Sequence, residues 1–332
     1  MSNFWKGKKV LVTGADGFIG SHLTEELVKK GADVRAFVLY NSFERWGNLE
    51  FLPENLLKKI EIFTGDIIDI KCAKQAVDSR DIVFHLAALI SIPYSYKCPF
   101  NFIDVNVKGT ANLLEGALNE SVDKFVHTST SEVYGTAQYV PIDESHPLQP
   151  QSPYSATKIA ADNIALSYYH SFDLPVTILR PFNTFGPRQS ARAIIPAIIS
   201  QIYSGKKTIE LGDLTPTRDF NYVKNTVDAF LKLAETKNVE GEVFNAGSNK
   251  EISIGDLVAL IVKTSGKKVK VISKKERMRP EKSEVRQLLA SYNKINKKCG
   301  WKPKVSLEEG IKITCEWIKD NVDRFKPFSY NI

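Results

Sequence analysis

Cysteine and histidine are scarce in this chain of 332 residues. The four cysteines are Cys72, Cys98, Cys299 and Cys315, with no Cys-x-x-Cys pair and no histidine cluster beside them. Disulfide frameworks and structural zinc sites are built on such spacings. The sequence therefore argues against a disulfide scaffold and against a bound metal, and its scattered thiols suit a reducing compartment such as the cytoplasm.

Long apolar stretches are also missing. No run approaches the roughly 18–20 apolar residues that cross a bilayer. The N-terminal residues MSNFWKGKKVLVTG lead into a strand pattern without a secretory leader. Since 43% of the residues are hydrophobic and 25% are charged, we expect a cytoplasmic globular protein with no membrane segment. The length allows one large domain or two smaller ones.

Charge is the one compositional bias, with a formal net charge of +7. Much of the excess lies between Lys263 and Lys298. A basic surface can bind nucleic acid, but such runs are more often a solvated face, and a few of these cations could meet a diphosphate instead. We predict no nucleic-acid partner.

Strand-like and helix-like segments alternate through the first 180 residues. Short apolar runs at residues 9–13, 34–39, 60–64, 82–87, 124–129 and 176–180 are separated by amphipathic stretches, the longest at 154–172. This alternation predicts a doubly wound parallel sheet, an α/β fold, over residues 1–182. Residues 183–332 have shorter segments and more proline and glycine. They are predicted mainly to cap the carboxyl ends of the strands, with some late segments returning to the sheet.

A glycine-rich turn follows the first predicted strand. It reads Gly14-Ala15-Asp16-Gly17-Phe18-Ile19-Gly20, a GxxGxxG pattern that opens a helix. Side chains at these glycines would block the tight turn, the approach of a pyrophosphate and the packing of the helix. Backbone N–H groups at the helix N-terminus then bind the negative charge. We predict dinucleotide binding through Gly14, Gly17, Phe18, Ile19 and Gly20.

The end of the second predicted strand bears on the choice of dinucleotide. NAD is usually recognised there by an acidic residue, but this chain reads Leu39-Tyr40-Asn41-Ser42. Asn41, Ser42 or Arg45 could accept a 2′-phosphate instead, so the sequence favours NADP. Other cofactor contacts are predicted at the ends of later strands, at Asp66, Ile67, Leu86, Ala87, Ala88 and Thr128.

Tyr154 and Lys158 are spaced i and i+4, on one face of the longest predicted helix. A nearby ammonium lowers the pKa of a phenol, so this pair predicts a tyrosine base. The strand before it ends in Thr128-Ser129-Thr130-Ser131-Glu132. In a doubly wound sheet this segment would face a nicotinamide, with hydroxyls and a carboxylate beside the reacting atoms. The histidines offer less, and we expect His22, His85 and His127 to be packed rather than catalytic.

Six motifs in order carry a family resemblance: the glycine turn, HLAA, STSEVYG, YSATK, RPFNTFGPRQ and RDFNYV. Together they resemble the extended short-chain dehydrogenase/reductase family, in its NAD(P)-dependent epimerase/dehydratase branch, over roughly residues 8–320. The resemblance implies a Rossmann domain, a smaller C-terminal α/β domain that binds a nucleotide-diphosphate sugar, a tightly held and recycled NAD or NADP, and a homodimer. Segments 107–119 and 154–172 are the expected dimer helices.

The resemblance also implies the catalytic roles. Tyr154 takes the proton of the sugar 4-hydroxyl, Lys158 positions the nicotinamide ribose, and Thr130 hydrogen-bonds the 4-oxygen. In a 4,6-dehydratase Glu132 would remove the C5 proton before the 6-hydroxyl leaves as water. Ser131 stands where many dehydratases carry an acid, so the proton donor to the leaving group is either Glu132 or water held by Ser131.

Several features favour one substrate class. The Thr-Ser-Glu triplet is similar to that of GDP-mannose 4,6-dehydratases and of UDP-glucuronate decarboxylases. SIPYSY, which begins at Ser91, and RPFNTFGPRQSARAIIP are similar to dehydratases of N-acetylglucosamine nucleotides, the GDP form of which opens legionaminic acid synthesis. The predicted substrate contacts are Ser91, Asn183, Arg188, Arg192, Arg218 and Arg279. A 4-epimerase, a decarboxylase and a non-catalytic RNA-binding or regulatory relative remain alternatives.

Overall fold

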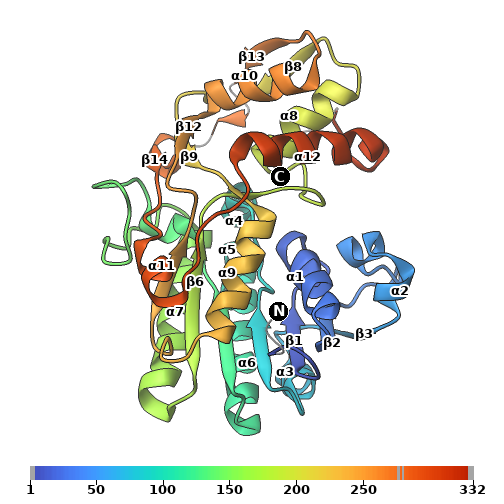
Figure 1. Cartoon of the computed structure of the whole chain (residues 1–332). Helices are drawn as coiled ribbons and strands as arrows, with labels where there is room; N and C mark the ends of the chain where they lie inside the picture. Colours follow the sequence, from blue (N-terminus) through green and yellow to red (C-terminus); the bar gives the residue numbers. More distant parts are fainter. Residues whose placement is uncertain (1–3, 275–276, 279, 328–332) are drawn as a thin grey trace.

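A seven-stranded parallel sheet forms the centre of the protein (Figure 1). The computed structural model describes residues 4–274, 277–278 and 280–327. Its strand order is β11-β6-β5-β4-β1-β2-β3. Strands β1 to β3 are added toward one edge, and the chain then crosses back to place β4 on the other side of β1, so the order of addition changes direction between β1 and β4. This is the order of a doubly wound dinucleotide fold, and the predicted parallel sheet is confirmed. The strands are β1 Lys9–Thr13, β2 Asp33–Leu39, β3 Ile60–Gly65, β4 Ile82–His85, β5 Lys124–Thr128, β6 Val176–Pro181 and β11 Val243–Ala246.

The central strands are apolar because both faces of the sheet are covered. All four residues of β4 are buried, as are all six of β6, and parallel strands covered on both faces read as continuous hydrophobic runs. The register pairs Thr13 at the end of β1 with Phe37 of β2 and His85 of β4. The carboxyl ends of these strands therefore meet at one edge.

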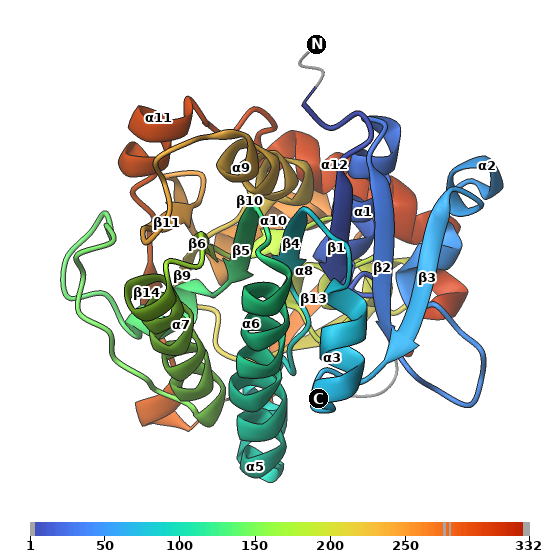
Figure 2. The same cartoon turned by 90° about the horizontal axis from the view of Figure 1, so that it is seen from below.

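Helices cover the two faces (Figure 2). On one face lie α3 (Ile70–Val77), α6 (Gly109–Glu120) and α7 (Pro153–Phe172), and on the other lie α1 (Phe18–Lys29) and α9 (Val223–Glu235). Each face has its own apolar core, one of which includes Leu113 and the other Phe230. Two segments beyond residue 182, α9 and β11, thus return to the sheet.

The cap lies over the carboxyl edge of the sheet (Figure 1). It contains α8 (Ile194–Tyr203), α10 (Ile254–Ser265) and α12 (Leu307–Asp320). Two small sheets join them, one of β8 and β13 and one of β12, β9 and β14. Their bounds are β8 Thr208–Leu211, β9 Thr217–Asp219, β12 Glu251–Ser253, β13 Lys270–Ser273 and β14 Gln287–Leu288.

Shorter elements connect these layers. They are η1 Gly47–Phe51, α2 Glu54–Leu57, α4 Ile92–Lys97, α5 Pro99–Phe102, the π-helix η2 Ile103–Lys108, η3 Ser131–Tyr134, β7 Thr184–Phe185, β10 Asn221–Tyr222, η5 Glu281–Ser283, α11 Asn293–Cys299 and η6 Val322–Arg324. The four cysteines are free thiols. Within the described ranges no helix is long and apolar enough to cross a membrane. That part of the chain also brings no three His, Cys, Asp or Glu side chains together as metal ligands.

Candidate active site at the carboxyl edge of the sheet

A cavity of about 1280 Å³ opens where the strand ends meet the cap. Most of the predicted site residues line it, although they come from segments far apart in the chain. They are Gly14, Gly17, Phe18, Ile19, Gly20, Asp66, Ile67, Leu86, Ala87, Ala88, Ser91, Thr128, Thr130, Ser131, Glu132, Tyr154, Lys158, Asn183, Arg188 and Arg192. A cavity of this size can hold a dinucleotide together with part of a second ligand.

A second cavity of about 330 Å³ adjoins the first inside the cap. Ser91, Glu132, Asn183 and Arg192 line both cavities, so the two are continuous there. Arg218 lines only the second one. Arg279, the remaining predicted substrate contact, lies outside the described residues.

The glycine turn has the shape that a dinucleotide pyrophosphate requires. Gly14 has a φ of +64°, and a Cβ there would lie 2.8 Å from the backbone nitrogen of Ala87. A Cβ at Gly20 would overlap the carbonyl of Gly14. No side chain caps the N-terminus of α1, so its first N–H groups are available to an anion. These residues fit the phosphates of a dinucleotide.

Asn41 and Ser42, predicted as cofactor contacts, do not line either cavity, although Leu39 and Arg45 on either side of them line the first. The side chain of Asn41 is used inside its own loop. Its Oδ1 accepts the backbone N–H groups of Phe43 and Arg45, and its Nδ2 donates to the carbonyl of Arg45 at 2.8 Å. Asparagine commonly closes a turn in this way. Its role here is to shape the loop after β2.

The predicted reacting groups come from the end of β5 and the start of α7. Thr130 precedes η3, and its Oγ1 accepts the backbone N–H of Glu132 at 3.2 Å. A capping box between Ser152 and Ser155, with Pro153 in the first turn, fixes the start of α7. Tyr154 and Lys158 then share one face of the helix. Two well-capped local structures thus place a hydroxyl, a carboxylate, a phenol and an ammonium on one wall.

Burial has opposite effects on the two titratable groups of α7. It raises the pKa of Tyr154 to about 12, although the hydrogen bond with Thr130 acts to lower it. It lowers the pKa of Lys158 to about 8. The net direction is thus opposite to the lowering that the sequence predicts for the pKa of Tyr154, because desolvation of the phenolate is the largest cause of the shift.

A buried ionic cluster that the sequence interpretation missed lies behind these two groups. Asp162 is one turn beyond Lys158 on α7 and is 1% exposed. Its Oδ2 accepts hydrogen bonds from Ser129 at 2.8 Å and from Arg180 Nη2 at 2.9 Å. Its negative charge acts to raise the pKa of Lys158. His127, 3.4 Å from Asp162, has a pKa lowered by burial to about 4 and stays neutral at pH 7.

Replacing Asp162 by asparagine should therefore move the pH profile of activity. Burial lowers the pKa of Lys158, and the negative charge of Asp162 partly opposes this effect. Without the carboxylate, the pKa of Lys158 should fall further below about 8. If the charged ammonium is needed, the alkaline loss of activity should begin at a lower pH than in the wild type. Because Arg180 also loses its partner, the free energy of unfolding should drop by about 3 kcal/mol. Asn163→Ala, at an exposed neighbouring position, is the control. If Asp162→Asn lost activity at the same alkaline pH as the wild type, Asp162 would have no role in setting the pKa of Lys158.

Asn106 is a second residue that was missed. It lies in the π-helix η2 and is buried. Its amide accepts the backbone N–H of Leu89 at 2.8 Å and donates to the Leu89 carbonyl at 3.0 Å and to Thr157 Oγ1 at 3.1 Å. It thus ties the cavity loop after β4 to α7. No spacing in the sequence shows this contact, because π-helical geometry has no strong sequence signal.

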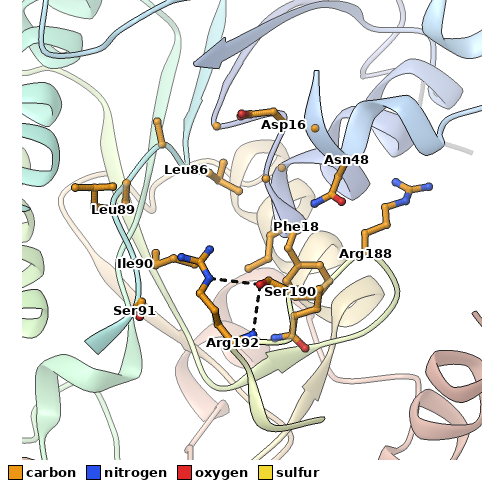
Figure 3. A pocket seen from close by; sticks show the side chains of 18 of the residues that line it. Asp16, Phe18, Asn48, Leu86, Leu89, Ile90, Ser91, Arg188, Ser190 and Arg192 are labelled. Carbon is orange, nitrogen blue, oxygen red and sulfur yellow. Dashed lines mark hydrogen bonds between the residues drawn. The ribbon is translucent and has the colours of Figure 1, made fainter. Parts of the chain in front are cut away.

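The arginines of the site differ in their surroundings. Arg188 has a φ of +69° and forms a 2.6 Å ion pair with Glu25 of α1. Arg218 forms a 3.0 Å ion pair with Glu284 inside the cap. Arg192 is exposed, and its Nε lies 3.4 Å from Ser190 Oγ (Figure 3). Figure 3 shows Asp16, Asn48 and Arg188 toward one end of the cavity and Ser91 and Arg192 toward the other.

Comparisons with known proteins agree with this geometry. Residues 11–314 match the family model described as GDP-mannose 4,6 dehydratase. A dTDP-D-glucose 4,6-dehydratase from Mus musculus is 36% identical, over 96% of this chain and 91% of that protein. The structure of Pal from Bacillus thuringiensis has a TM-score of 0.85 and 36% identity, covering 94% of this chain and 99% of that one. UDP-glucuronic acid 4-epimerase from Bacillus cereus, in complex with UDP-glucuronic acid and NAD, has a TM-score of 0.86 and 31% identity over 94% of this chain and 99% of that one.

Proposed function

Since the chain belongs to the GDP-mannose 4,6-dehydratase family of NAD(P)-dependent nucleotide-sugar enzymes, we propose that it is a nucleotide-sugar 4,6-dehydratase. The observation that carries this proposal is the position of Glu132. Glu132 lines both cavities, and Thr130, Tyr154 and Lys158 line the first of them beside it. A carboxylate at this position can act as the base for C5 of a sugar that extends from the cap to the reacting groups. A simple 4-epimerisation needs no base at C5.

The residues divide the reaction between them. Thr130 binds the 4-oxygen of the sugar, and Tyr154 accepts the proton of the 4-hydroxyl. A dinucleotide held by the glycine turn would supply reversible hydride transfer, from C4 and back to C6 within one turnover. Glu132 removes the C5 proton, which the adjacent 4-ketone makes acidic, and the 6-hydroxyl leaves as water. The proton for this water comes from Glu132 or from a water molecule held by Ser131, and C5 regains a proton, from Glu132 or solvent, when hydride returns to C6.

GDP- or UDP-N-acetylglucosamine is the proposed substrate, with a 4-keto-6-deoxy sugar as the product and legionaminic acid synthesis as a fitting pathway. The support is the resemblance of the segments around Ser91 and Asn183 to dehydratases of such sugars. Both residues line the junction of the two cavities. The guanidinium groups of Arg192 and Arg218 suit a diphosphate because their planar forks pair with two phosphate oxygens.

A UDP-sugar 4-epimerase is the second candidate, because epimerases stand beside dehydratases among the similar proteins. A UDP-glucuronate decarboxylase shares the same first step of C4 oxidation and is a further candidate. All three reactions use Tyr154, Lys158 and Thr130. They differ in the later chemistry at C5 and C6, so the product distinguishes them.

Product mass provides the test. The protein is incubated with GDP-N-acetylglucosamine, UDP-N-acetylglucosamine and UDP-glucuronate in separate reactions without added reductant. The dehydratase proposal predicts loss of one water from an acetylated sugar, with no net reduction of the cofactor. An unchanged mass with a new epimer would identify an epimerase instead. Loss of carbon dioxide from UDP-glucuronate alone would identify a decarboxylase.

We also propose that the protein works in the cytoplasm as a homodimer that pairs α6 and α7 with their copies. Exposed apolar side chains next to and at the ends of these helices support it, namely Phe100 at 77%, Ile103 at 48% and Phe172 at 54% exposure. Phe100 and Ile103 lie near the start of α7 and Phe172 at its end, so a second copy packed along the helix could cover them. Sedimentation should give twice the 37.2 kDa chain mass, and Ile103→Asp should give monomers. A monomeric wild-type protein would contradict this.

A further inference from the structure

The end of β2 carries no acid to bind the adenosine ribose of a dinucleotide. The last residue of the strand is Leu39, followed by Tyr40 and Asn41. A carboxylate near this point accepts hydrogen bonds from the ribose 2′- and 3′-hydroxyls of NAD and repels the 2′-phosphate of NADP. The selectivity of this protein therefore depends on which charges its fold brings to the end of β2.

The structure brings Asp16 there from the glycine turn. Ala15 donates its backbone N–H to Phe37 of β2 at 3.3 Å, which holds the turn against the strand. Asp16 lines the cavity; burial raises the pKa of its carboxyl, and the nearby backbone N–H of Leu39 acts to lower it. From the other side, Asn48 donates its backbone N–H to the Asp16 carbonyl at 2.9 Å. Gly47 packs against the same carbonyl and has a φ of +56°. A Cβ at Gly47 would lie only 2.7 Å from the Asp16 carbonyl oxygen.

Arg45, the cation in the loop after β2 that the sequence suggests as a partner of a 2′-phosphate, already forms an ion pair. Arg45 Nη2 lies 2.6 Å from Glu50 Oε2, and Glu50 also accepts the backbone N–H of Trp46. Glu50 lines the cavity as Asp16 does. Among the other cations of this wall, Arg188 pairs with Glu25. Arg324 lies over the ring of Phe51 with its guanidinium carbon 4.3 Å from the ring centroid.

We propose that Asp16 supplies the carboxylate that the end of β2 lacks, binds the adenosine ribose hydroxyls, and makes the protein selective for NAD over NADP. This inference rests on the dinucleotide dependence of the proposed function, and it adds which of the two dinucleotides the protein selects. It replaces the preference for NADP that the sequence suggested. The turn can provide the carboxylate because the register pairs Thr13, the last residue of β1, with Phe37, and the turn that follows stays bonded to β2 through Ala15 and Phe37.

The experiment measures which dinucleotide the protein holds, independently of any sugar. Purified full-length protein is incubated with equal amounts of NAD and NADP and separated from free ligand. After denaturation, the released dinucleotides are quantified by chromatography. The wild-type protein should hold NAD over NADP by about 100-fold, since a carboxylate facing a phosphate is strongly unfavourable. Asp16→Asn should lower this ratio by about tenfold or more, mainly by admitting NADP.

Asp66→Asn is the matched control. Asp66 lines the same cavity at the end of β3, so its change should alter the affinities for both dinucleotides together and leave their ratio unchanged. Thermal unfolding of each variant verifies that the protein is folded. Wild-type protein that holds NADP, or an Asp16→Asn ratio equal to that of the wild type, would overturn the inference. Selective NAD binding that depends on Asp16, in a protein that transforms no nucleotide sugar, would instead overturn the proposed function alone.

Discussion

Tyr154→Phe should lower the turnover number by about 10³-fold, which is the usual contribution of a positioned proton acceptor. The variant lacks only the hydroxyl that takes the proton of the sugar 4-hydroxyl. The ring keeps its place, because its packing against Phe102, with ring centroids 6.2 Å apart, does not involve the oxygen. The dissociation constants for the dinucleotide and for the nucleotide sugar should therefore change by less than about threefold.

Tyr168→Phe is the control for this change. Tyr168 lies on the same helix but donates its hydroxyl to Glu115, at 3.3 Å, away from the cavity. It should retain full turnover. A Tyr154→Phe protein that turned over at the wild-type rate would contradict the assignment of the base. If that variant kept its biological role without any turnover, the protein would be a non-catalytic relative.

Glu132→Gln should abolish dehydration while leaving the first oxidation intact. Glutamine keeps the size of the side chain but cannot accept the C5 proton, so water loss should fall by about 10³-fold. Oxidation at C4 uses Tyr154, Lys158, Thr130 and the bound dinucleotide, and does not involve Glu132. Reduced dinucleotide should therefore accumulate when the nucleotide sugar is added, which its near-ultraviolet absorbance measures. In deuterated water, C5 should exchange in the wild type and not in the variant.

Ser131→Ala gives the comparison for Glu132. If a water molecule held by Ser131 protonates the leaving 6-hydroxyl, this variant should slow water loss and leave C5 exchange unchanged. If Glu132 also supplies that proton, Ser131→Ala should dehydrate at a rate close to that of the wild type. Glu132→Gln that formed the dehydrated product at the wild-type rate would exclude Glu132 as the C5 base.

Local patterns are enough to predict the parallel sheet and the positions of its elements. The sequence predicts the first strand at residues 9–13, and the structure places β1 at Lys9–Thr13. It predicts the long helix at 154–172, and α7 is observed at Pro153–Phe172. Both are bounded by strong local signals, a glycine turn after β1 and a capped proline start before α7. The residues of the cavity wall near them are predictable for the same reason.

Contacts between distant segments are not predictable in this way. Asn41 was expected to face the cofactor, but a turn within its own loop uses its side chain. The pKa of Tyr154 was expected to fall, but burial by surrounding segments raises it to about 12. Asn106 was missed because its partners, Leu89 and Thr157, lie 17 and 51 residues away along the chain.

Periodicity, capping and turn chemistry act over a few residues, so the amino-acid order is enough to predict the strands, the helices and the glycine turn, and to propose the reacting groups. How these groups are charged and which partners they have depends on the folded structure. It brought Asp16 to the end of β2, paired Arg45 with Glu50, and buried Asp162 between Ser129 and Arg180. These pairings follow from strand register and from the packing of α7 on the sheet. Desolvation and charge pairing depend on distances in space, which the order of residues along the chain does not state.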